Sequence, residues 1–278
     1  MPGYGYGISD FISSSKSAAT RGGASFDNTY SCAFDGVDDY LEGGDVLHND
    51  GQTPMTLSAW VNISTPAPHT RVATIAGKKR IRNAPKYAMR GWDIGFITSG
   101  AQTNRLQFRI VGVDSGGSVI GSLIKKALTL SFTDGLWHNV VVTYDGSESA
   151  TGVKFYVDAI EDTSTQTLSD TLSGNSPNDP TVDFKIGTAP RYGGDYFYNG
   201  NIDELAIWSS TALTQEQVTA IYNLGNPTDL TSLSPVSWWR MGDPNGQSSF
   251  PTITDDGSAS NDVTMTNMIA ADIETDVP

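Results

Sequence analysis

Apolar and polar side chains alternate along much of this chain, and this period of two limits the fold more than any other feature. In "MTLSAWVNIS", every second residue from Met55 to Ile63 is apolar, as in a strand that buries one face. The alternation recurs in "RLQFRIVGV", "WHNVVVTYD", "VKFYVDA" and "VDFKIG". Turn residues separate these runs, often as Asp-Gly, for example Asp134-Gly135 and Asp145-Gly146. The pattern predicts many short antiparallel strands.

One segment, "LTQEQVTAIYNLGNP", has the period of a helix instead. Thr214 and Gln217 have the spacing of a capping box, and apolar residues at helical spacing follow them. Gly225 and Pro227 then end the helix. The sequence therefore predicts an all-β fold, a two-sheet antiparallel sandwich, with one short helix near residues 214–224.

The charge of the chain excludes one class of partner. Its 278 residues carry 31 acidic and 17 basic side chains, a formal net charge of −14, so most of the surface repels a polyanion. We therefore expect no nucleic-acid partner. The acid excess is mostly Asp, which favours turns and oxygen-rich cation sites, so Ca²⁺ is the cofactor to test. Cys32 is the only cysteine, which leaves no intrachain disulfide.

The two ends of the chain differ from its middle. Residues 1–25 are rich in Gly and Ser, and we expect a flexible N-terminal arm that either docks on a neighbouring subunit or stays mobile. We expect residues 26–278 to form one domain, in which "SWWRMGD" adds a strand and the last residues return to the core. The first residues lack the pattern of a signal peptide, and we expect no membrane insertion.

The order of the motifs resembles a known family. "AFDGVDDYLEGG", "MTLSAWVNIS", "GLWHNVVVTYDG", "VKFYVDA", "FKIGTA", "YNGNIDELAIW" and "LTQEQVTAIYNLG" follow one another as in the laminin-G-like, concanavalin-A-like jelly-roll family. The resemblance spans about residues 30–225 and implies a jelly roll of two sheets. The chain departs from the family where Ala159, rather than glycine, follows Asp158. That departure leaves the geometry of this hairpin turn open.

The stretch "FDGVDDYLEGG" has two interpretations. Asp35 and Gly36 suit a tight turn, in which the Asp side chain bonds its own backbone. The resemblance implies instead a Ca²⁺ site near the first and last strands of the family, with Asp38, Asp39 and Asp203 as candidate ligands.

Catalysis is not predicted. A glycoside hydrolase needs two carboxyl groups that flank the cleaved bond, and the related glucanases hold theirs in a Glu-x-Asp-x-x-Glu pattern that this chain lacks. Asp203 and Glu204 are adjacent, so a regular strand would place them on opposite faces. The histidines have no catalytic spacing, and we expect a structural role for His138.

Two segments are candidates for binding. In "RYGGDYFYNG" the candidate ligand-binding residues for glycans are Tyr192, Asp195, Tyr196, Tyr198 and Asn199. The alternative is that these aromatic residues seal an edge of the sandwich or contact another subunit.

The segment "GKKRIRNAPKYAMRGW" is basic in an acidic protein. Lys78, Lys79, Arg80 and Arg82 are candidates to dock an acidic partner or a second copy in a homo-oligomer. The alternative is a solvated basic loop.

Three functions are consistent with the sequence. The closing residues from "MTNM" to "DVP" and the start of the chain resemble in style modules of bacteriophage structural proteins. The first prediction is therefore a non-catalytic virion protein, a capsid decoration or fibre component made in the host cytoplasm and displayed on the virion surface. Its partners would be other virion proteins, copies of itself and cell-surface glycans. The alternatives are an extracellular carbohydrate-binding module of an exported bacterial protein and, less favoured, a glycoside hydrolase.

Overall fold

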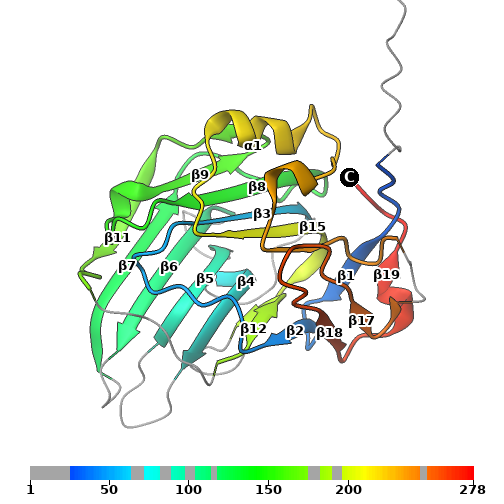
Figure 1. The fold of residues 1–278 in the computed structure, drawn as a ribbon, viewed down its shortest axis with the longest axis horizontal. Helices are drawn as coiled ribbons and strands as arrows, with labels where there is room; N and C mark the ends of the chain where they lie inside the picture. The colour runs from blue at the N-terminus through cyan, green and yellow to red at the C-terminus, as the bar shows by residue number, and fades with distance from the viewer. Residues whose placement is uncertain are drawn as a thin grey trace, which may run out of the picture.

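Two antiparallel β-sheets pack face to face in the computed structural model of this chain (Figure 1). The predicted all-β jelly-roll sandwich is confirmed. The structure describes residues 26–63, 72–81, 89–97, 104–113, 118–174, 182–189, 196–244 and 249–278. The predicted arm, residues 1–25, lies outside these ranges, and the domain boundary at residue 25 stays a prediction.

The first sheet has eight strands in the order β10-β9-β8-β3-β15-β1-β19, and β16 also pairs with β15. The bounds of its strands are β1 Ser31–Asp35, β3 Met55–Asn62, β8 Trp137–Tyr144, β9 Val153–Val157, β10 Ile160–Glu161, β15 Asn199–Ser209, β16 Ser237–Trp239 and β19 Ile273–Glu274. Strands from both ends of the chain meet here, because Ser31 of β1 pairs with Glu274 of β19.

The second sheet has nine strands in the order β11-β7-β6-β5-β4-β12-β2-β18-β17. The bounds of its strands are β2 Tyr40–Gly44, β4 Val72–Ile81, β5 Met89–Ile97, β6 Leu106–Val113, β7 Val119–Ala127, β11 Thr165–Asp170, β12 Phe184–Ile186, β17 Thr252–Ile253 and β18 Val263–Thr266. A separate pair is formed by β13 Thr188–Ala189 and β14 Tyr196–Phe197. The expected closing strands after the helix are thus present in both sheets.

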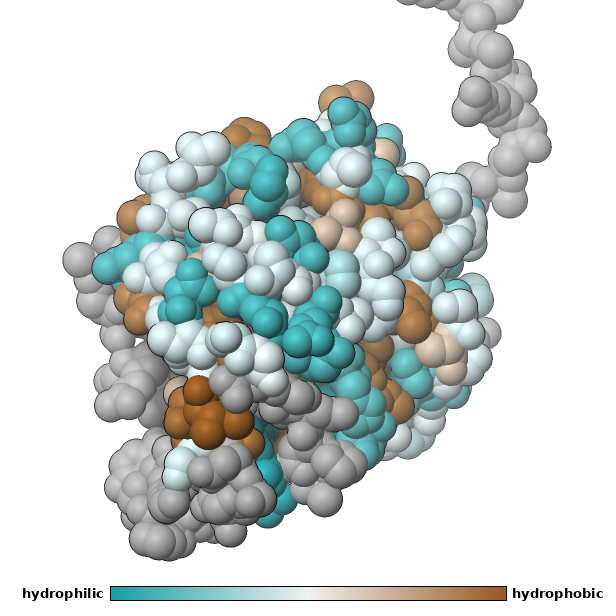
Figure 2. Space-filling model, turned by 60° about the vertical axis from the view of Figure 1, so that its left-hand side comes forward, coloured by the Kyte–Doolittle hydropathy of each residue, from teal (hydrophilic) through white to brown (hydrophobic). Residues whose placement is uncertain are grey.

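The core lies between the sheets and follows the predicted alternation. Leu57 and Val61 of β3 point inward with Phe108 of β6, and all three are fully buried. The ring of Phe108 packs against that of Tyr144, with ring centroids 5.5 Å apart. Figure 2 shows that one outer face is mainly hydrophilic or neutral, with hydrophobic side chains in small groups. The period of two therefore separates core from surface as expected.

Helix α1, Gln215–Tyr222, covers the outer face of the eight-stranded sheet (Figure 1). Thr214 and Gln217 form the predicted capping box, and Val218 and Ile221 are buried against this face. Three short 3₁₀ helices are η1 Ala150–Gly152, η2 Thr231–Leu233 and η4 Ala270–Asp272. Among the described helices, none has the length and apolar character needed to cross a membrane.

The hairpin that departs from the family keeps a tight turn. Asp158 and Ala159 join β9 to β10, and both have left-handed backbone conformations, with φ of 52° and 62°. Two successive left-handed residues match the twist of a two-residue hairpin, but a side chain at this φ is strained. Ala159 therefore adopts the conformation that glycine prefers.

Candidate functional site

The carboxylates of the first loop gather in one place. Ligand atoms of Asp35, Asp38 and Asp39 all lie within 4.8 Å of one another. Asp35 Oδ1 accepts hydrogen bonds from the backbone N–H groups of Val37, at 2.7 Å, and Asp38. Asp39 Oδ2 accepts one from the N–H of Asp35, at 3.0 Å. The tight-turn interpretation is thus correct, and it also brings three carboxylates together.

These carboxylates leave negative charge close to the core. Burial, with repulsion from Asp35 and Asp38, raises the pKa of Asp39 to about 6. A hard cation would relieve this repulsion, and an all-oxygen set suits Ca²⁺. The predicted ligand Asp203 does not belong to this group, which includes Asp35 instead.

The tyrosine segment is described only in part. Tyr192 and Asp195 lie outside the described residues, and of Tyr196 the structure gives the backbone in β14. The Tyr198 side chain is 0% exposed, and its ring meets the edges of Phe34 and Phe96 in the core. Tyr198 therefore seals the sandwich, and the prediction that it binds a ligand was wrong. Asn199 is half-buried and pairs with Asp35 across β15 and β1.

The predicted basic loop is partly strand. Lys78 and Lys79 lie in β4, and both side chains are buried, whereas Arg80 is exposed. Arg82 lies outside the described residues. The prediction that Lys78 and Lys79 face a partner was therefore wrong.

Internal ion pairs hold these two lysines. Lys78 Nζ donates to the carboxylate of Asp45 and to a backbone carbonyl. Lys79 Nζ lies 3.5 Å from Asp93 Oδ2, and Arg109 Nε donates to Asp93 Oδ1 at 2.9 Å. Buried charges need such partners, which the sequence pattern alone did not identify.

A pocket that sequence reasoning missed lies beside β16. It has a volume of about 740 Å³ and is open to solvent. Its lining residues come from an early and a late part of the chain. Its lining residues are Phe26, Asp27, Thr29, Tyr30, Asp229, Thr231, Trp238, Arg240, Asp243, Pro244 and Asp256. We call it the terminal pocket. It combines aromatic rings, hydroxyl groups and carboxylates.

A β-bulge in β15 supports the terminal pocket. The pairing of β15 with β3 shifts by one residue between Asp203 and Ala206, and Glu204 has a left-handed backbone with φ of 47°. Ile202 and Leu205 both point into the core, so the two acidic residues between them share the outer side. The expectation that Asp203 and Glu204 lie on opposite faces was wrong, because the strand is not regular there.

The two acidic side chains are buried, at 0% exposed for Asp203 and 3% for Glu204. Asp203 accepts hydrogen bonds from Asn28 Nδ2 at 2.9 Å and from the N–H of Glu204 at 2.7 Å. Burial, with the neighbouring charge of Glu204, raises the pKa of Asp203 well above its usual value. Burial also raises the pKa of Glu204 to about 7, against the opposing effect of Arg240.

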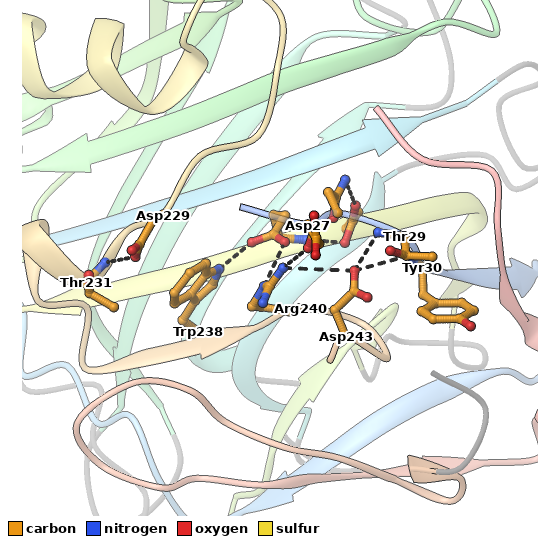
Figure 3. A network of polar contacts seen from close by, with 11 residues as sticks. Asp27, Thr29, Tyr30, Asp229, Thr231, Trp238, Arg240 and Asp243 are labelled. Atoms are coloured by element: carbon orange, nitrogen blue, oxygen red, sulfur yellow. Dashed lines mark hydrogen bonds and ion pairs between the residues drawn. The ribbon is translucent and has the colours of Figure 1, made fainter. Parts of the chain in front are cut away.

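Arg240 connects this acidic pair to the pocket. Its Nε donates to Glu204 Oε1 at 3.2 Å, and Trp238 Nε1 donates to Glu204 Oε2 at 2.6 Å. The guanidinium lies over the ring of Phe26, 4.3 Å from its centroid, and it also donates to the carbonyl of Asp27. Figure 3 shows Arg240 close to Asp27, which comes from a segment far away in the sequence.

The same network binds the backbone of Thr29 and Tyr30. Asp243 Oδ2 accepts hydrogen bonds from the N–H groups of Thr29, at 2.7 Å, and Tyr30, at 3.2 Å (Figure 3). The rings of Phe26 and Trp238 stack with centroids 6.0 Å apart and an interplanar angle of 9°. The adjacent aromatic and basic residues of "SWWRMGD" were the available sequence signal, but two of their partners, Phe26 and Asp27, lie more than 200 residues away.

The buried acidic pair, Asp203 and Glu204, does not line the terminal pocket. Trp238 and Arg240 donate to the Glu204 carboxylate, and Asn28 donates to that of Asp203. The geometry therefore does not present this acidic pair on either side of a bound glycosidic linkage, as hydrolysis requires.

Comparison with known protein families gives a match to the central part of the chain. A family described as the concanavalin A-like lectin/glucanases superfamily matches residues 35–219. All lining residues of the terminal pocket lie outside this range. No curated protein sequence matches the chain.

Solved structures are similar to this chain to different degrees. A protein from Bacteroides ovatus ATCC 8483, provisionally named a carbohydrate-binding protein, has a TM-score of 0.58 at 19% identity, covering 91% of this chain. The match spans 62% of that protein's length. Domain 4 of AbnA, a GH43 extracellular arabinanase from Geobacillus stearothermophilus, in complex with arabinotriose, scores 0.39 at 18% identity, covering 69% of this chain and 76% of that one. The CBM40 of the Ruminococcus gnavus IT-sialidase, bound to alpha2,6 sialyllactose, scores 0.43 at 10% identity, covering 69% and 97%.

Proposed function

We propose that this chain, which belongs to the concanavalin A-like lectin/glucanases superfamily, is a non-catalytic carbohydrate-binding module. The terminal pocket is the observation that carries the proposal. Sugars are bound by aromatic faces together with polar groups that fix orientation, and Tyr30, Thr231 and Asp256 offer both kinds of contact. The names of the similar structures agree with this function.

A glycan array tests the proposal. We expect the purified protein to bind at least one glycan, and Tyr30→Leu to weaken that binding roughly tenfold, since contact of a ring face with an aromatic side chain is worth about 1 kcal/mol or more. Tyr40→Leu is the matched control, because Tyr40 is half-buried and lies outside the pocket lining. Thermal unfolding of both variants checks that they fold. An array without any bound glycan contradicts the proposal.

We further propose that the chain is an exported, extracellular or surface-displayed bacterial module, and that Ca²⁺ at Asp35, Asp38 and Asp39 stabilises it. The remaining predicted ligand-binding residues, Tyr192, Asp195, Tyr196 and Asn199, are kept as a second glycan contact. Repeating the array with a chelator separates a Ca²⁺-dependent glycan contact from a Ca²⁺-independent one.

The virion function stays a prediction. It rests on the style of the terminal segments. Either the N-terminal arm or the basic residues Arg80 and Arg82 would anchor the protein to virion proteins or to a second copy. Mass spectrometry of purified particles tests it directly. The prediction requires the protein in the particles, and its absence from them removes this function.

A further inference from the structure

We propose that the terminal pocket selects amino sugars, meaning glycans that carry free ammonium groups. This inference rests on the proposed carbohydrate binding and adds the chemical class of the ligand. It follows from three properties of the pocket: its charge, the state of its one guanidinium, and its aromatic lining.

The charge of the lining is strongly negative. Four carboxylates, Asp27, Asp229, Asp243 and Asp256, face one guanidinium, that of Arg240, which leaves a formal charge of −3. A site of one sign repels ligands of the same sign and concentrates those of the opposite sign. The pocket therefore disfavours uronates, sialic acids and phosphorylated sugars.

Arg240 is the one positive charge in this count, and it contacts protein groups, including Asp243 at 4.0 Å. Its Nε is bonded to Glu204, and its terminal nitrogen donates to the carbonyl of Asp27. Its flat face lies against Phe26. To bind an anionic sugar through this Nε, Arg240 would have to release Glu204. The buried Glu204 carboxylate would then lose the positive charge that compensates it.

Two carboxylates are better placed to receive a cation. Asp229 uses Oδ1 to cap the N–H of Thr231, at 2.8 Å, and as a carboxylate it has further acceptor sites. Partial burial of its carboxyl group, with repulsion from Asp255 and Asp262, raises the pKa of Asp256 against the opposing effect of Arg240. A ligand ammonium beside Asp256 would reverse both effects, because an opposite charge stabilises the ionised carboxylate.

The aromatic lining suits the same ligand. Arg240 over Phe26 shows that a cation is already held against an aromatic face at this site. Tyr30 is half-buried and lines the same pocket. An amino sugar offers an apolar ring face for Tyr30 and an ammonium group for Asp229 or Asp256.

Calorimetric titration with three oligosaccharides tests the proposal at physiological salt. The probes are a glucosamine tetramer, its N-acetylated counterpart with the same backbone but no charge, and a galacturonate tetramer. We expect the glucosamine tetramer to bind roughly tenfold more tightly than the N-acetylated one. We expect no binding of the galacturonate tetramer.

Matched variants locate the effect. Asp229→Asn and Asp256→Asn should each weaken glucosamine binding by roughly threefold to fivefold, as expected for a partly exposed charge pair. Asp183→Asn removes the same charge from an exposed position outside the pocket and should leave binding unchanged. Equal weakening by all three variants would mean non-specific attraction to an acidic protein, which overturns the proposal.

The remaining outcomes separate this inference from the proposed function. Equal or tighter binding of the N-acetylated or galacturonate tetramer overturns the selection of amino sugars and leaves carbohydrate binding intact. Failure of all three tetramers to bind overturns the selection as well. Carbohydrate binding itself then depends on the glycan array, and it fails only when the array is also negative.

Discussion

Burial has opposite outcomes for the pKa values of two sets of acidic side chains, Asp162 on one side and Asp203 with Glu204 on the other. Asp162 is 3% exposed, and it accepts hydrogen bonds from the N–H groups of Thr129 and Leu130, both at 2.8 Å, and of Ser164 at 3.1 Å. Burial opposes its charge, but these hydrogen bonds and one from the Thr129 hydroxyl outweigh burial and lower its pKa. Asp203 and Glu204 are equally buried, yet their pKa values are raised.

The comparison teaches that donors, rather than burial, decide the role of a carboxylate here. Asp162 has enough N–H donors to stay ionised and join loop segments. Asp203 and Glu204 repel each other, and Glu204 depends on Arg240 for compensation. The group of Asp35, Asp38 and Asp39 lies between these cases, since its hydrogen bonds are local and repulsion remains.

The largest expected effect comes from removing the compensating charge. Arg240→Met should lower the free energy of unfolding by about 3 kcal/mol or more, because Glu204 then loses its buried partner. Urea unfolding measures the loss. Arg80→Met, which removes an exposed charge, should change stability by less than about 0.5 kcal/mol. Equal losses in the two variants would mean that Arg240 does not compensate the acidic pair.

Removing the Asp162 carboxylate should lower the free energy of unfolding by a smaller amount. Asp162→Ala leaves the backbone donors of Thr129 and Leu130 without this acceptor, and we expect a loss of about 2 kcal/mol. A lowered pKa means that this stability is present above the unfolded pKa and is lost as pH falls through the folded pKa. Unfolding at neutral and acidic pH measures both effects. The account fails here if the variant loses more stability at acidic than at neutral pH.

Ca²⁺ should stabilise the protein through the group of Asp35, Asp38 and Asp39. The pKa of Asp39 is raised to about 6, so its contribution to stability is full below the unfolded pKa and is lost as pH rises through about 6. Saturating Ca²⁺ at neutral pH should restore about 1–3 kcal/mol, as expected for a ligand that binds the folded state. Thermal unfolding with Ca²⁺ and with chelator measures this. Asp38→Asn should abolish the gain, whereas Asp183→Asn should keep it.

The smallest effect concerns backbone rather than charge. Ala159→Gly should stabilise the protein by about 0.5–1 kcal/mol, because Ala159 has a positive φ. Unlike Asp162→Ala, it should show the same change at every pH. The control Ala220→Gly in helix α1 should destabilise by about 1 kcal/mol. Destabilisation by Ala159→Gly would mean that the turn is not strained.

The fold was largely predictable because it depends on local periodicity. The strand at Met55–Asn62 and the capping box at Thr214 both follow from neighbouring residues. Burial of Tyr198 was not predictable, because an aromatic residue in an alternating run suits a core strand and a binding loop equally.

The candidate site was harder to predict for two reasons. A bulge of one residue turned Glu204 to the side of Asp203, and periodicity carries no signal for such an insertion. The terminal pocket joins residues 26–30 to residues 229–244 and to Asp256, which are distant in sequence from the first segment; long-range hydrogen bonds connect the two ends of the pocket. Lys79 was likewise taken for a surface residue because its partner Asp93 lies on the next strand.

A crystal structure of the protein with a bound glucosamine tetramer tests the central claim most directly. The account predicts that the sugar lies in the terminal pocket, against the ring of Tyr30 and within hydrogen-bonding distance of Asp229 or Asp256. A sugar bound on the nine-stranded sheet, with the terminal pocket empty, would contradict it.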